Sequence, residues 1–210
     1  MKNNLFPIAK EGWKYIAYSI ASFIVFAILD LEFFELLSFV IVLLFIAVFR
    51  NPERDLPTFE ENSVLCPVDG KVIAIDELSD SEYAYKVTIN SAYKDVGILR
   101  SPLSSQVTDI KKVHGTRLSM EDSLSSKINE NVSIIFQDTN ENNIKVTHSL
   151  KQSFVPISLD ITISKNLLQS SRYGLMIDGI TEIYLPHNFR LSLIMGEETT
   201  ASESLVGYFS

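Results

Sequence analysis

The sequence predicts a mainly β (α+β) soluble domain of short strands, preceded by an N-terminal helical hairpin that is transmembrane or re-entrant. Two apolar runs without any charge, residues 15–29 and 36–49, predict the hairpin. Beyond residue 62, short runs rich in β-branched residues recur every 8–12 residues or so between turn signals, as in β-rich domains. A chain of 210 residues suffices for one such domain and an anchor. The predicted parts are a cytoplasmic N-terminal segment (1–14), the hydrophobic hairpin (15–49) and the β-rich domain (50–210).

The two apolar runs suit a hairpin better than one long helix. Each run is about 15 residues, roughly 22 Å as a helix, whereas a comfortable span takes roughly 20 residues. The stretch between them, Asp30-Leu-Glu-Phe-Phe-Glu35, carries three acids that a turn accommodates more easily than a bilayer core. A buried helical pair is the alternative, although neither run shows an amphipathic face. Whether the arms cross the bilayer or only dip into it stays open.

Basic residues flank both open ends of the predicted hairpin. Lys10 and Lys14 precede the first arm, and Arg50 and Arg54 follow the second. Lysine and arginine favour the cytoplasmic side, so both ends are expected there. We therefore expect an inner (cytoplasmic) membrane protein whose β-rich domain faces the cytoplasm. Arg50 and Arg54 suit lipid phosphates at the membrane face, or serve only as stop-transfer charges.

The β-rich part contains two hairpin signals, an Asp69-Gly70 pair and the polar cluster at residues 137–142. The strands predicted around them are residues 63–67 with 71–75, and 132–136 with 143–148. Strict apolar alternation over residues 157–163 predicts a further strand. Two short helices are also predicted, over residues 119–127 and 164–171.

Composition excludes several classes of function. The formal net charge of −8 disfavours a nucleic-acid partner, because phosphate neutralisation needs clustered lysine and arginine. The single cysteine, Cys66, excludes an intramolecular disulfide and offers no zinc framework, so no metal site is expected. Cys66 is expected to be a small buried residue. No small-residue cleavage site of a secretory signal follows the apolar stretch.

One segment, Arg172-Tyr-Gly-Leu-Met-Ile-Asp-Gly-Ile-Thr-Glu-Ile-Tyr-Leu-Pro186, resembles the self-processing segment of the compact prokaryotic phosphatidylserine decarboxylases. In that family the backbone breaks at a Gly-Ser pair, and the serine becomes the pyruvoyl group that carries out decarboxylation. Here Gly179 lies at the cleavage position and Ile180 replaces the serine. A shift of the alignment by one residue places no serine there either. The resemblance therefore implies the family scaffold without its nucleophile, and no cofactor is expected.

Two further segments extend the resemblance to the catalytic positions. Pro67-Val-Asp-Gly-Lys-Val72 is similar to a family motif whose aspartate belongs to an Asp-His-Ser triad of self-cleavage, which makes Asp69 a remnant triad acid. An ordinary Asp-Gly turn is the alternative reading. In Asp95-Val-Gly-Ile-Leu-Arg-Ser-Pro102, Gly97 replaces the triad histidine, and glycine has no side chain that takes a proton. Arg100 in this segment joins Arg50 and Arg54 as a candidate lipid phosphate contact.

Other matches concern the scaffold and the substrate. Phe49-Arg-Asn-Pro-Glu-Arg54 resembles the family junction after the anchor, and residues 196–205 resemble its closing segment. The paired arginines of the family have no good match around residues 147–155, which also puts substrate binding in doubt. His114, His148 and His187 are expected at the surface or in turns. Thr181 is the alternative nucleophile, since a threonine can attack the preceding carbonyl as serine does.

The resemblance supports three hypotheses of function. The favoured one is a membrane-anchored relative in phosphatidylethanolamine metabolism that neither self-cleaves nor forms a pyruvoyl group. Such a protein would have a lipid-binding or regulatory role. Its expected partners are the membrane, an anionic phospholipid and an active decarboxylase paralogue. The second is an active phosphatidylserine decarboxylase that uses Thr181 or another route, so enzymatic activity stays open. The third is a membrane-tethered scaffold domain.

Overall fold

The structure, a computed structural model, describes residues 6–54, 60, 62–79, 82–119 and 128–210. The chain forms two compact units, Met1–Glu53 and Arg54–Ser210. The first is called the helical unit and the second the β unit.

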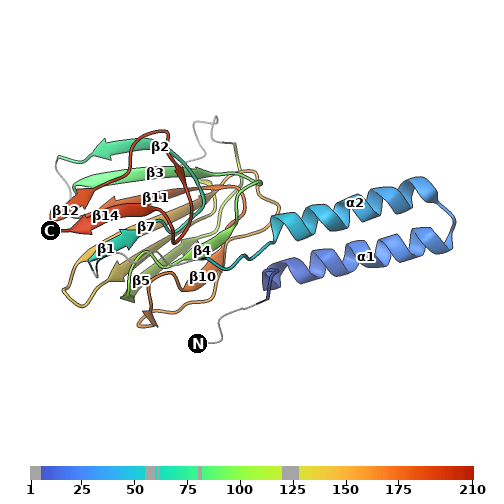
Figure 1. Cartoon of the computed structure of the whole chain (residues 1–210), viewed down its shortest axis with the longest axis horizontal. Coiled ribbons are helices and arrows are strands. Elements are labelled where there is room, and N and C mark those ends of the chain that lie inside the picture. Colours follow the sequence, from blue (N-terminus) through green and yellow to red (C-terminus); the bar gives the residue numbers. More distant parts are fainter. Residues whose placement is uncertain (1–5, 55–59, 61, 80–81, 120–127) are drawn as a thin grey trace. The chain divides into compact units, whose positions relative to one another are not determined.

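The helical unit is an antiparallel pair of helices (Figure 1). A short 3-10 helix, η1 (Lys10–Gly12), leads into α1 (Trp13–Ile28), and α2 (Glu32–Val48) follows a tight turn. Asp30 in this turn has a φ of 52°, a left-handed conformation that aspartate tolerates better than most residues. At the open end, Tyr15 stacks on Phe49 with ring centroids 5.4 Å apart. The predicted helical hairpin is therefore confirmed.

The two helices have 16 and 17 residues and leave many large apolar side chains exposed. Both are shorter than the roughly 20 residues of a typical span. No helix in the described part of the chain is long and apolar enough to cross a membrane. The prediction that the arms are transmembrane is thus not supported.

The described part of the β unit is built from antiparallel strands in three sheets (Figure 1), which confirms the prediction of a mainly β domain. The largest has eight strands in the order β13-β2-β3-β11-β7-β6-β5-β9, and the smaller ones have the orders β1-β14-β12 and β4-β10-β8. The strands are β1 (Ser63–Leu65), β2 (Gly70–Glu77), β3 (Tyr85–Ser91), β4 (Ile98–Arg100), β5 (Ser105–Val113), β6 (Asn131–Gln137), β7 (Asn143–Leu150), β8 (Ser158–Leu159), β9 (Asn166–Leu167), β10 (Arg172–Leu175), β11 (Gly179–Leu185), β12 (Phe189–Leu191), β13 (Glu198–Thr199) and β14 (Leu205–Phe209).

Alternating burial shows how the large sheet makes its core. In β11, Thr181, Ile183 and Leu185 are fully buried, while the residues between them are half-buried. Strand β7 alternates in the same way, as period-two side-chain orientation requires. The inner faces of these strands pack against Tyr173 of β10, so the core joins the large sheet to a smaller one.

Two local predictions meet different outcomes. Strands β6 and β7 form the expected hairpin, with Gln137 opposite Asn143 at its closed end. The prediction of a hairpin around Asp69-Gly70 is wrong. Strand β1 pairs with β14, whereas β2 pairs with β3 and β13. An Asp-Gly pair indicates a local chain reversal, but here the flanking strands find long-range partners.

Two further elements are shorter than predicted or absent. The alternating segment 157–163 contributes only the two residues of β8, which pair with Gly174 and Leu175. The helix predicted over residues 164–171 is wrong, since β9 lies there and pairs with Ser105 and Gln106. The helix predicted over residues 119–127 falls, beyond Ser119, outside the described residues.

Candidate functional site

The predicted cleavage position lies at the start of β11, inside a regular ladder. Gly179 pairs with Ser91 of β3 and Leu150 of β7, and Ile180 pairs with Asn90 and Ser149 on the same two strands. The residue before them, Asp178, has a φ of 56°. The half-buried Ile180 side chain is a hydrocarbon without any nucleophilic atom. Position 180 therefore does not fit a self-generated pyruvoyl group, which needs a side-chain hydroxyl.

Backbone and side chains occupy the space beside both glycines. A Cβ at Gly97 would lie 2.9 Å from the Met176 carbonyl oxygen and 3.1 Å from Ile177 Cγ1. The carbonyl of Gly97 in turn accepts a 2.8 Å hydrogen bond from the Met176 amide. A Cβ at Gly179 would clash with the Met176 sulfur. The predicted position of the triad histidine is thus closely packed, and a side chain there would displace the 176–177 segment.

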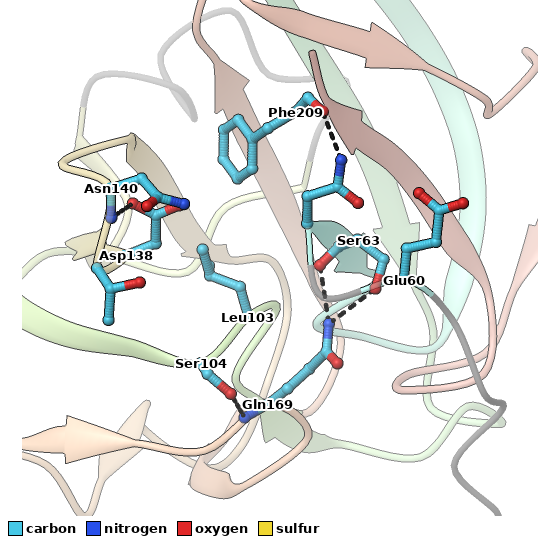
Figure 2. Close-up of a pocket in the computed structure, with 10 residues that line it drawn as sticks. Glu60, Ser63, Leu103, Ser104, Asp138, Asn140, Gln169 and Phe209 are labelled. Carbon is cyan, nitrogen blue, oxygen red and sulfur yellow. Dashed lines mark hydrogen bonds between the residues drawn. The ribbon is translucent and has the colours of Figure 1, made fainter.

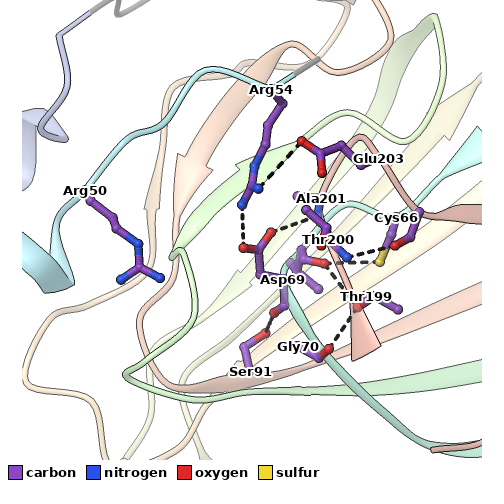
Figure 3. A network of polar contacts seen from close by, with 12 residues as sticks. Arg50, Arg54, Cys66, Asp69, Gly70, Ser91, Thr199, Thr200, Ala201 and Glu203 are labelled. Carbon is purple, nitrogen blue, oxygen red and sulfur yellow. Dashed lines mark hydrogen bonds and ion pairs between the residues drawn. The ribbon is translucent and has the colours of Figure 1, made fainter. Parts of the chain in front are cut away.

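Asp69, which the resemblance predicts to be a triad acid, is held by an arginine (Figure 3). Arg54 Nη2 lies 2.6 Å from Asp69 Oδ2, and the Ala201 amide donates to Asp69 Oδ1 at 2.8 Å. Arg54 Nη1 also lies 3.7 Å from Glu203. The structure therefore joins three segments that the sequence singled out separately: the junction, the Asp-Gly motif and the closing segment.

The three arginines proposed as lipid contacts differ in their surroundings. Arg54 is engaged by Asp69 and Glu203, so its contact with a lipid phosphate stays a prediction. Arg50, in the helical unit, donates from Nη1 to the Ala47 carbonyl at 3.0 Å and so caps the C-terminal end of α2. Arg100 is only 5% exposed, and its Nη1 donates to the Ser170 carbonyl at 3.5 Å. Its contact with a lipid phosphate therefore stays a prediction as well.

A cavity of about 290 Å³, here called the Asp69 pocket, lies at the end of β3, the strand that pairs with β11. Asp69, Asn90 and Asp95 line it together with two lysines, Lys71 and Lys94. Asn90 is also the β3 partner of Ile180, so the pocket and position 180 share one row of the large sheet. Side chains of both charges therefore line a cavity next to the predicted processing position.

A third lysine extends this polar region. Lys151 Nζ donates to Asn90 Oδ1 at 2.6 Å and lies 3.0 Å from Asp178 Oδ1. It thereby connects the row that contains Ile180 to the turn that precedes Gly179. The sequence reasoning missed Lys71, Lys94 and Lys151, although Lys71 directly follows the Asp-Gly motif and was a detectable signal.

His148 was expected at the surface or in a turn, and that prediction is wrong. Its ring is fully buried, with Nδ1 2.8 Å from Thr181 Oγ1 and Nε2 2.6 Å from the Tyr173 hydroxyl. Burial lowers the pKa of His148 from 6.5 to about 3 and raises the pKa of Tyr173 above its usual value. The alternation of Ile144, Val146 and His148 along β7 was the signal that places this histidine on the inner face.

The remaining candidates fit their predicted surroundings. His114 and His187 are exposed. Cys66 is buried as expected, its thiol donates to the Val68 carbonyl at 3.2 Å, and burial raises its pKa to about 11. A thiol protonated at neutral pH is a poor nucleophile. Among the described residues no group of histidine, cysteine and acidic side chains is arranged to hold a metal ion.

The fold and the site define a β-rich scaffold with a hydrocarbon side chain at residue 180, a paired acid at residue 69 and a charged pocket. The family described as phosphatidylserine decarboxylase matches residues 41–207. Phosphatidylserine decarboxylase proenzymes of Geotalea uraniireducens (strain Rf4) and Geobacter sp. (strain M21) are 30% and 31% identical over 211 and 218 residues. In both comparisons 99% of each chain is covered. The chain belongs to the phosphatidylserine decarboxylase family.

Proposed function

We propose that this chain is a membrane-associated member of the family that stays uncleaved and binds a phospholipid head group instead of decarboxylating it. The observation that carries this proposal is Ile180, a hydrocarbon side chain in a fully paired strand at the processing position. Its neighbourhood agrees, because chain packing at Gly97 leaves no room for the family base. Both groups that self-cleavage requires are thus replaced.

The Asp69 pocket supplies the proposed binding site. A serine phospholipid head group carries a phosphate, a carboxylate and an ammonium group, so it needs partners of both charges. Lys71 and Lys94 suit the anionic groups, whereas Asp95 suits the ammonium group. In this proposal a bound head group makes the chain a lipid sensor or regulator, and an active decarboxylase paralogue is its proposed partner.

The helical unit supplies the proposed membrane contact. Its exposed side chains include Phe33, Leu36 and Leu44, which are 72%, 64% and 57% exposed. Burying each such side chain in lipid is worth about 1.5–3 kcal/mol. We infer that the hairpin inserts into the cytoplasmic side of the inner membrane, with the basic residues at its open end remaining near the lipid phosphates.

The intact mass of the purified full chain tests the absence of processing. A single species of 23.7 kDa, without labelling by a carbonyl-reactive amine reagent, is expected. Two fragments separated near residue 180, with a carbonyl-reactive smaller one, would refute the proposal.

Vesicle binding tests the head-group site. The full chain is mixed with phosphatidylcholine vesicles that either contain or lack phosphatidylserine. The test variant is Lys71→Ala/Lys94→Ala, which removes both lysines of the pocket. The control variant is Lys111→Ala/Lys165→Ala, which replaces exposed or half-buried lysines outside the pocket. We expect phosphatidylserine to strengthen binding, and only the pocket variant to lose that gain. Equal losses in both variants would mean that general surface charge, not the pocket, attracts the lipid.

One observation favours a second candidate, cleavage at Thr181. The Thr181 hydroxyl lies 2.8 Å from a ring nitrogen of His148, the separation expected of a nucleophile and its base. Its oxygen would attack the Ile180 carbonyl carbon and form an ester as the peptide C–N bond breaks. Loss of the Thr181 α-proton would then expel the Ile180 carboxylate, and water would replace the nitrogen as ammonia to leave a 2-oxobutanoyl group.

Two features weigh against this second route. A base with a pKa of about 3 is some four units below neutrality, where general-base catalysis is inefficient. Thr181 is also fully buried in a ladder with β3 and β7, away from the water that the last step consumes. Fragment masses separate the two outcomes, since cleavage by this route ends the larger fragment at Ile180 and is abolished by Thr181→Val.

A further inference from the structure

A second and larger cavity lies at the other end of the large sheet from Ile180. It has a volume of about 740 Å³, within the range of small-molecule sites. One wall is the β6–β7 turn, whose flanking residues Gln137 and Asn143 are paired. Ile180 instead aligns with Ser149 and Asn131 at the opposite end of these strands. Asn131 and Gln137 lie six residue steps apart along β6, which is about 20 Å at 3.3 Å per step.

The β6–β7 turn that forms this wall is internally fixed. Asp138 Oδ1 accepts hydrogen bonds from the amides of Asn140 and Asn142, each 2.8 Å long, and its Oδ2 accepts one from Asn142 Nδ2 at 2.8 Å. The carboxylate thus orders the turn, and the side chains of Thr139 and Asn140 both line the cavity. Figure 2 shows Asn140 beside Asp138. A ligand would meet these groups already positioned.

On the opposite wall of the cavity, the side-chain amide of Gln169 is held in place by hydrogen bonds. Gln169 Nε2 donates to the Ser63 carbonyl at 2.9 Å and to the Pro102 carbonyl at 3.2 Å. This fixes the side chain and leaves its carbonyl oxygen as an acceptor. The Gln169 backbone amide donates to Ser104 Oγ at 3.0 Å, so the serine hydroxyl can donate its own proton to a ligand.

The chemistry of the lining selects a class of ligand. Amides, hydroxyls and two carboxylates, those of Glu60 and Asp138, surround the cavity, and Leu103 and Phe209 add an apolar wall. None of the described lining residues is lysine, arginine or histidine. Phosphate and carboxylate ligands therefore find no counter-charge here. Paired donors and acceptors beside an apolar surface instead match neighbouring hydroxyl groups on a carbon ring.

We propose that this cavity, here called the distal pocket, binds an uncharged hydroxyl-rich ligand, either a sugar or another cyclic polyol. The ligand is a free molecule or the head group of a glycolipid, since both present the same hydroxyls. The distal pocket is separate from the Asp69 pocket, so this assignment stands independently of the proposed lipid function.

Saturation-transfer NMR on the full chain tests the assignment. The protein is held in nanodiscs, because glycoside detergents would compete. One arm adds methyl glycosides and inositol at about 10 mM, enough to saturate a site with a Kd of about 1 mM. The second arm incorporates a glycosyl diacylglycerol into the nanodisc. Binding in the first arm identifies a free ligand, and binding in the second arm alone identifies a glycolipid.

A matched pair of variants locates the binding. Thr139→Ala/Asn140→Ala removes two lining side chains while keeping the Asp138 hydrogen bonds, and Thr162→Ala changes an exposed threonine outside the distal pocket. We expect the first to weaken binding about fivefold, as loss of one or two hydrogen bonds predicts, and the second to leave it unchanged. The assignment is overturned if no ligand binds in either arm, or if the two variants bind equally.

Discussion

At the scale of single residues, Thr181 and His148 are two polar side chains that form a hydrogen bond with each other inside an apolar core. Thr181→Val keeps the shape of the side chain but leaves His148 Nδ1 without its 2.8 Å partner. An unsatisfied buried group costs about 1–3 kcal/mol, so the free energy of unfolding should fall by that amount. Thr147→Val is the matched control, since its hydroxyl meets Ser133 Oγ on the half-buried outer face.

Denaturant unfolding in mild detergent measures both variants. The control should lose less than about 1 kcal/mol, because water can replace the missing partner there. Equal losses would show that the Thr181 hydroxyl contributes nothing special to the core.

The buried His148 ring also predicts how stability depends on pH. Its pKa is about 3 in the folded chain and 6.5 without burial, so between these values the unfolded chain binds a proton that the folded chain does not. The free energy of unfolding should therefore not be reduced by His148 above pH 6.5. It should decrease by up to about 1.4 kcal/mol per pH unit as the pH falls toward 3.

Unfolding between pH 7.5 and 5 isolates this contribution before most carboxylates titrate. His148→Gln should flatten the pH dependence, whereas His187→Gln, which changes an exposed histidine, should retain it. If the two variants show the same slope, His148 is not the group responsible.

At the scale of elements, the close packing of Gly97 against the 176–177 segment predicts that restoring one residue does not restore processing. Ile180→Ser supplies a hydroxyl but no base, so the chain should keep its intact mass. Gly97→Ala should lower the free energy of unfolding by about 1–3 kcal/mol, because its Cβ would lie 2.9 Å from the Met176 carbonyl oxygen. Lys94→Ala, an exposed change in the preceding loop, should stay within about 0.5 kcal/mol.

Mass spectrometry and denaturant unfolding check these two expectations. Cleavage of the Ile180→Ser variant would mean that some other group in the β unit acts as the base. A Gly97→Ala variant as stable as the control would mean that the 176–177 segment moves easily, and that the site is not closed.

Elements also show what could be predicted from the sequence and what could not. The β6–β7 hairpin was predictable because its strands are neighbours in the chain and its turn is polar. The partners of β1 and β2 were not, because β1 pairs with β14 at the far end of the chain. The predicted replacements at Gly97 and Ile180 could be read directly from the sequence. The ion pair of Arg54 with Asp69 and the inward position of His148 could not, because they depend on tertiary packing.

For the whole molecule, the exposed apolar surface of the helical unit predicts how the chain meets a membrane. Phe33→Lys/Leu36→Lys places two charges on side chains that are 72% and 64% exposed. Each apolar side chain withdrawn from lipid costs about 1.5–3 kcal/mol, so vesicle binding should weaken by well over about tenfold. Ile194→Lys/Met195→Lys is the matched control, because these apolar residues of the β unit are 67% and 71% exposed.

Flotation of the full chain with phospholipid vesicles provides the measurement, with unfolding of the β unit followed to exclude a general loss of fold. We expect the helical-unit variant to stay in the dense fraction and the control to float like the original chain. The reverse result would place the membrane contact on the β unit and remove the anchoring role from the hairpin. If both variants float, neither surface alone holds the chain at the membrane, and the proposed insertion of the hairpin is wrong.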